Sequence, residues 1–286
     1  MAVDENLWNE SFGALDPGSL PKWPCPSCGK NALELDKKKI IYIQNKNQYR
    51  PEDFKKEDFE ESIWLGIFKT IATVYEKFQY FQHKFVGFLT CKECGESVSF
   101  IGRAEIPIEL SGQHTYRTTQ LYPEYFSPPL HFFPLDKRYP VSIQQNLIRS
   151  FSFAFNDAAS AASAIRQSIE SLLDEVKIEN EDDRGRRLSL FDRIQKLGGE
   201  NKQHADLFDA IRFLGNEGSH SGRVNRSDLI AAYVVVDHIL DEIFIRPEVR
   251  NKVLKSGRDL TNAYKPDSKQ VKDLSKANEK QRGPMV

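Results

Sequence analysis

Three polar side chains in the segment AIRFLGNEGSHSG are of types that bind and transform phosphate groups. Arg212, Asn216 and His220 recur at four-residue steps, and Gly215 and Gly218 lie between them. Arginine binds phosphate through paired hydrogen bonds, and histidine exchanges a proton near neutral pH. The pattern indicates either a polar site that the backbone approaches closely or a broken connection between two helices.

The four cysteines form two Cys-x-x-Cys pairs, in WPCPSCGK and LTCKECGE: Cys25, Cys28, Cys91 and Cys94. A glycine follows each pair and suits the tight turn of a zinc knuckle. Four thiolates match one tetrahedral zinc ion and leave it no open position, so the predicted zinc is structural. Disulfides are the alternative, but a cytosolic chain keeps its thiols reduced.

The elements that position the cysteines predict a zinc-ribbon-like module over residues 1–110. KIIYIQ and ESVSFIGRAEIPIEL are typical of strands, and a helix is expected between the knuckles from about Ser62 to Phe85. Its aromatic residues recur at three- and four-residue steps, which predicts either packing against the ribbon or the next domain, or a groove for a partner. Residues 111–140 are rich in Pro and Tyr and predict an extended linker, with Phe132 and Phe133 as anchors.

The second half of the chain predicts an antiparallel helical bundle over residues 141–256. Helices are expected at about 141–158, 158–176, 188–197 and 202–214, and a central one from Asn225 or Ser227, both good N-cap residues. The fold class is therefore α+β, mainly α.

Composition excludes several classes of protein. Hydrophobic residues make up 40% and charged residues 28% of the 286, as in soluble globular proteins. There is no secretory signal and no apolar run long enough for a bilayer, which predicts a cytoplasmic protein without membrane contact. From Arg246 onward, eleven Lys or Arg face five Asp or Glu, so the tail at 257–286 is either a polyanion-binding or a solvated flexible segment.

The helical half resembles a bacterial family of unknown function related to the HEPN helical bundles. SAIRQSIESLLDEV and the later AIRFLGNEGSH carry the resemblance over about residues 139–246, with Arg166 and Glu170 in the first segment. Such proteins stand alone or are appended to restriction enzyme subunits, and several have similar knuckles. The resemblance implies a homodimer, contact with RNA or DNA, and a role in defence against phage or foreign DNA.

Many HEPN domains cleave RNA without a metal ion. Carried over to this chain, Arg212 would hold the scissile phosphate, Asn216 would orient it, and His220 would move a proton. On an unbroken helix, however, Arg212 and His220 lie about 12 Å apart along the axis and about 80° apart around it, whereas Asn216 and His220 share a face. Two alternatives stay open beside catalysis.

In the first alternative the bundle binds nucleic acid without cleaving it, or acts with the ribbon as an adaptor for a protein or DNA partner. In the second, the glycines let two helices touch or end a helix, and the polar residues are structural. Arg212 would then pair with Glu170 or Asp209.

Overall fold

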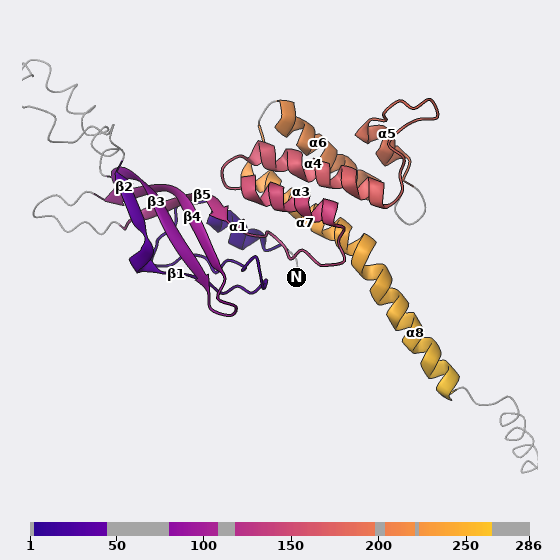
Figure 1. Cartoon of the computed structure of the whole chain (residues 1–286). Helices are drawn as coiled ribbons and strands as arrows, with labels where there is room; N and C mark the ends of the chain where they lie inside the picture. Colours follow the sequence, from indigo (N-terminus) through magenta and orange to yellow (C-terminus); the bar gives the residue numbers. More distant parts are fainter. Residues whose placement is uncertain (1–2, 45–79, 108–117, 198–203, 221–222, 265–286) are drawn as a thin grey trace, which may run out of the picture. The chain divides into compact units, whose positions relative to one another are not determined.

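The computed structural model describes residues 3–44, 80–107, 118–197, 204–220 and 223–264 (Figure 1). The chain divides into two units, residues 1–239 and 240–286. Within the described ranges, no helix has the length and apolar character needed to cross a membrane.

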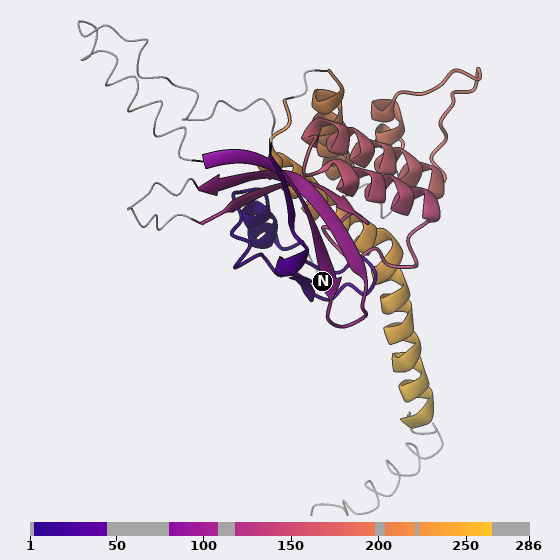
Figure 2. The same cartoon turned by 60° about the vertical axis from the view of Figure 1, so that its left-hand side comes forward.

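The N-terminal part of the first unit is built on an antiparallel sheet. Strands β3 and β4 form its long central pair (Figure 2). Their register runs from Tyr80 opposite Pro107 to Thr90 opposite Ser97. Burial alternates along β4, as expected for a strand with one face in the core. The strand order is β1-β3-β4-β5, and β2 also pairs with β3. The bounds are β1 Leu33–Leu35, β2 Ile41–Gln44, β3 Tyr80–Cys91, β4 Ser97–Pro107 and β5 Gln120–Ser127.

The prediction that a helix continues to about Phe85 is wrong, because β3 begins at Tyr80. Residues 45–79, which hold most of that expected helix, lie outside the described residues. From Phe85 to Cys91 every second residue is buried, and the whole strand pairs with β4. Pairing with a long partner strand overrides a local aromatic spacing that also fits a helix. The strands expected at KIIYIQ and ESVSFIGRAEIPIEL are confirmed as β2 and β4.

The segment expected as a linker contributes to the fold of the first unit. Its residues 120–127 form β5, which extends the sheet beside β4. Phe132 and Phe133 are each only 2% exposed, which confirms their role as anchors. The Phe132 ring stacks on Trp8 with centroids 4.1 Å apart, and Phe126 of β5 contacts Phe155 at 4.7 Å. Aromatic packing therefore joins the sheet to the helical half of the same unit.

The remaining regular structure of the described residues is helical. Asp157 caps α4 by accepting from the backbone N–H of Ser160, and Asn225 caps α7 by accepting from that of Asp228. Tyr233 of α7 is fully buried, and its hydroxyl lies 2.8 Å from that of Ser150. The bounds are α1 Glu5–Ser11, α3 Val141–Phe153, α4 Ala158–Glu175, α5 Leu190–Gln195, α6 Ala205–His220, α7 Arg226–Leu240 and α8 Arg246–Tyr264, with short helical turns at Lys37–Lys39 and Asp241–Ile245.

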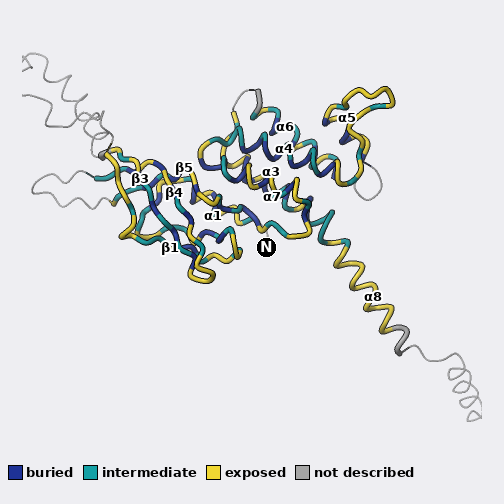
Figure 3. The backbone as a smooth tube through the Cα atoms, viewed as in Figure 1, coloured by how far each residue is buried: buried dark blue, intermediate teal, exposed yellow. Residues whose placement is uncertain are grey.

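Burial separates the helices into two groups (Figure 3). The apolar face of α4 is buried, and α3 and α6 both pack against this helix. In the second unit, the side chains of α8 from Glu248 to Leu260 are exposed. This helix continues beyond residue 256, where the bundle was expected to end, up to Tyr264.

Candidate functional site

The four cysteines come together from two distant parts of the chain. Sγ of Cys25 lies 3.6 Å from that of Cys94, and Sγ of Cys28 lies 3.7 Å from that of Cys91. All four sulfur atoms lie within 4.8 Å of one another. A tetrahedral ion with Zn–S bonds of about 2.3 Å would separate its sulfur ligands by about 3.8 Å. The spacing of the thiols therefore fits one bound metal ion.

Two matching turns hold these thiols. Gly29 and Gly95 follow the second cysteine of each pair at φ values of +71° and +78°, a conformation that glycine adopts without strain. Each glycine N–H donates to the carbonyl of the first cysteine of its pair, at 2.8 and 3.0 Å. Lys30 of one knuckle pairs with Glu93 of the other at 2.7 Å. Backbone hydrogen bonds thus shape each turn, and one ion pair connects the two turns beside the sulfur atoms.

The electrostatics of the cluster favour thiolate at one position. Desolvation raises the pKa of Cys91, but the backbone N–H groups of Cys94 and Glu93 and the nearby thiols outweigh it and lower that pKa to about 7. Burial raises the pKa of Cys25. A metal ion at the centre would supply the positive charge that four clustered thiolates require.

The helix that carries the predicted polar residues is not broken at its glycines. Helix α6 runs without interruption from Ala205 to His220. A Cβ at Gly218 would lie 2.6 Å from the carbonyl oxygen of Ala159, and one at Gly215 would lie 2.5 Å from Cβ of Arg166. Both glycines therefore permit close approach of α4 to α6, the structural role left open by the sequence.

Arg212 is held on the side of α6 that faces α5. Its Nε donates to Asp209 at 2.7 Å, which confirms one of the two expected partners. Its Cζ lies 5.2 Å from the ring centroid of Phe191 and 4.2 Å from that of Phe213. The guanidinium is thus fixed by one carboxylate and two aromatic rings, with 14% of the side chain exposed.

The three predicted residues do not converge within one chain. Asn216 is half-buried on α6, and His220 is the last residue of that helix, although its side chain lies outside the description. Because α6 is continuous, Arg212 and His220 are about 12 Å apart along the axis and about 80° apart around it. Asn216 and His220 lie one turn apart on the same face. Their catalytic roles stay predictions.

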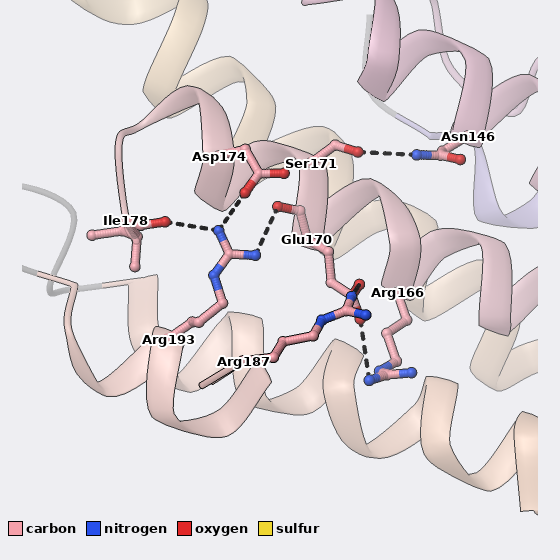
Figure 4. A network of polar contacts seen from close by, with 8 residues as sticks. All are labelled: Asn146, Arg166, Glu170, Ser171, Asp174, Ile178, Arg187 and Arg193. Carbon is pink, nitrogen blue, oxygen red and sulfur yellow. Dashed lines mark hydrogen bonds and ion pairs between the residues drawn. The ribbon is translucent and has the colours of Figure 1, made fainter. Parts of the chain in front are cut away.

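A network of arginines covers the neighbouring part of α4 and the segment before α5 (Figure 4). Arg166 pairs with Glu170 at 3.1 Å, and Arg187 approaches the other oxygen of the same carboxylate at 4.0 Å. The side chain of Arg187 is 85% exposed. Two guanidinium groups thus share one carboxylate, and the three side chains carry a net charge of about +1.

Arg193 serves a different purpose in the same network. Its side chain is only 7% exposed, and it donates to Asp174 at 2.6 Å and to the Ile178 carbonyl at 2.8 Å. These bonds connect α5 to the C-terminal end of α4. We call the surface formed by Arg166, Arg187, Phe191, Arg212 and Phe213 the arginine face.

Comparison with known proteins found a similarity to one family over part of the helical half. Residues 149–262 match the model of a family described as a domain of unknown function, DUF4145. The match covers less than half of the chain, begins in α3 and ends in α8. It includes Arg212, Asn216 and His220 and leaves out the four cysteines. Neither a curated protein nor a solved structure matches the chain.

Sequence reasoning missed most of the arginine face. Arg187 lies between the helices expected at 158–176 and 188–197 and was not singled out. Phe191 and Phe213 were not singled out either, because they fit the expected helices as ordinary apolar residues. An exposed aromatic residue is recognised only when the buried stripe is known. A signal was nevertheless present in the apolar Phe213 directly beside Arg212, at a position off the buried stripe of α6.

Proposed function

We propose that this chain is a HEPN-like nucleic-acid-binding protein whose arginine face holds the phosphate backbone. The observation that carries the proposal is the pairing of Arg166 and Arg187 with the single carboxylate of Glu170. Surplus guanidinium charge at an exposed surface is the usual footprint of a phosphate contact. The arginine fork also matches two phosphate oxygens at once.

The geometry of this pair suits capture of a phosphate. Arg187 keeps 85% of its side chain exposed, so its donors stay accessible, while Arg166 is held by contact of its aliphatic stem with Gly215. The Glu170 oxygen lies 4.0 Å from Arg187, longer than a hydrogen bond. A phosphate group would therefore offer Arg187 better partners than it has in the free protein.

We further propose that the cysteine cluster binds one structural zinc ion. Four protein sulfur ligands fill a tetrahedral shell, so the ion has no position for substrate. Its contribution is to join the knuckle at Cys25–Cys28 to the hairpin of β3 and β4 at Cys91–Cys94. This would stabilise the sheet that packs on the helical half through aromatic contacts.

Binding is tested with labelled oligouridylate and oligothymidylate about 20 nucleotides long, by fluorescence anisotropy across a salt series. Wild-type protein is expected to bind with an affinity that falls as salt rises. Arg166→Gln with Arg187→Gln is expected to lower the affinity and reduce the slope of log K against log salt by about 2. The matched control is Arg103→Gln, which removes a 65% exposed arginine from β4. Wild-type protein that binds neither oligonucleotide would overturn the proposal.

RNA cleavage is a second candidate function, favoured by the placement of Asn216 and His220 one turn apart on α6. An unbroken helix places Asn216 and His220 one turn apart on one face, where an amide and an imidazole could act on the same phosphodiester. Arg212 donates to Asp209 and lies about 80° from His220 around the helix axis. A cation from a second copy of the chain would therefore complete the site.

Cleavage is tested with zinc-loaded protein, transfer RNA and chelator in the buffer. The expected result is metal-independent cleavage that His220→Ala abolishes while oligonucleotide affinity is retained. Products that persist unchanged in His220→Ala would exclude this residue as the acid–base group. No cleavage together with salt-dependent binding would leave the binding function alone.

A further inference from the structure

We propose that Phe191 and Phe213 form a stacking subsite for unpaired bases. The guanidinium of Arg212 lies against both rings and contributes a positive charge. This inference rests on the proposed function and adds to it a substrate class, single-stranded nucleic acid. The subsite would take a nucleobase by its face, without reading its sequence, because every base has an aromatic face.

The first argument is the exposure of two large aromatic rings. Phe213 is 62% exposed and Phe191 is 45% exposed, although they come from different helices and lie near one guanidinium. Contact of an apolar ring with water is unfavourable, and stacking on a base would bury the faces of these rings. Two such rings from α5 and α6 around Arg212 make a composite surface rather than an isolated exposed residue.

The second argument is the order that Arg212 imposes. The Asp209 carboxylate fixes Nε at 2.7 Å, and Cζ lies 4.2 Å from the Phe213 centroid. The ring orientation is therefore set before any ligand arrives, which lowers the entropy cost of binding. A guanidinium held against aromatic rings also adds positive charge beneath a stacked base.

The third argument is the position of the rings beside the phosphate-binding arginines. The Arg166 stem contacts α6 at Gly215, which is one turn from Arg212. Arg187 precedes α5, where Phe191 occupies the first turn. The residues proposed to contact the backbone and those proposed to contact bases therefore come from the same neighbouring elements: α4, α6, α5 and the segment before α5. A paired duplex hides the faces of its bases, so only an unpaired strand can use both kinds of contact.

The experiment separates stacking from charge. Wild-type protein is titrated with oligothymidylate about 20 nucleotides long and with an abasic oligonucleotide of equal length and charge. Binding to the oligothymidylate should be at least about tenfold tighter, as one or more stacked bases would give. The double variant Phe191→Leu/Phe213→Leu keeps most of the apolar area but removes the rings, and should bind the two oligonucleotides equally. A Phe191→Leu/Phe213→Trp protein, which has one aromatic ring at this site, should regain part of the preference for oligothymidylate.

The matched control is Tyr42→Leu, which removes a 37% exposed aromatic ring from β2 and should keep the wild-type preference. Equal binding of both oligonucleotides by wild-type protein would overturn the stacking subsite and leave the phosphate-binding function standing. If wild-type protein binds neither oligonucleotide, the stacking subsite and the phosphate-binding function are both overturned. If the double variant keeps its preference but changes mass in light scattering, the rings form a protein interface and the inference is wrong.

Discussion

Replacing Gly218 by Ala tests the close approach of α4 to α6. In a free helix this change would raise stability by about 1 kcal/mol. Here the new Cβ would lie 2.6 Å from the carbonyl oxygen of Ala159, an atom of the α4 backbone. Restoring an ordinary contact of 3.4 Å requires a shift of about 0.8 Å. Overpacking of this kind costs about 1–3 kcal/mol.

The net expectation is a loss of up to about 2 kcal/mol in the free energy of unfolding, once the gain in helix propensity is subtracted from the cost of overpacking. Urea denaturation followed by circular dichroism measures it. Gly257→Ala in α8 is the matched control, because no atom outside the local backbone lies within 4 Å of its new Cβ. That variant should gain helical signal. A Gly218→Ala protein more stable than wild type would refute the contact, because Ala raises stability only at a helical position that no neighbouring backbone approaches.

Three other substitutions probe the remaining parts of the account. Cys94→Ser should abolish binding of the proposed zinc ion, measured by elemental analysis, and lower the free energy of unfolding by several kcal/mol. Arg193→Ala should cost about 2 kcal/mol in urea denaturation, because it removes the bonds between α5 and α4, while Lys196→Ala at an exposed ion pair should stay within about 0.5 kcal/mol. Hydrogen bonds from Arg138 lower the pKa of Asp136 from 3.8 to about 2, so the stability from this carboxylate is present above pH 3.8 and lost as the pH falls through 2. Asp136→Asn should therefore cost about 1 kcal/mol at pH 7, after screening by solvent, and nothing below pH 2 in acid titrations of stability.

Local patterns predicted the parts of the fold that depend on neighbouring residues. The Cys-x-x-Cys-Gly turns need only a short segment each, and four matching thiols imply one metal site whatever lies between them. Helix α4 was expected at 158–176 and runs from Ala158 to Glu175, because its apolar period and its capping position are both local. The capping role of Asn225 is also confirmed.

Features that depend on distant partners were missed. Aromatic residues near Phe81 and Phe85 fit a helical period, but β4 supplies a pairing strand 11 residues long and β3 forms instead. Prolines within YPEYFSPP predicted a linker, but this segment forms β5. The strand lies at the edge of the sheet beside β4, where Pro123 is accommodated at a register shift. The role of Gly215 and Gly218 depended on the position of α4, which no local pattern contains.

Photo-crosslinking tests the central claim, nucleic-acid binding by the arginine face, most directly. Zinc-loaded wild-type protein is irradiated with a single-stranded oligonucleotide that carries 4-thiothymidine, and crosslinked peptides are identified by mass spectrometry. We expect crosslinks in the peptides that contain Phe191 and Phe213, and their loss when Arg166 and Arg187 are both replaced by Gln. Crosslinks confined to the sheet, between residues 80 and 127, or crosslinks that persist in the double variant would contradict the account.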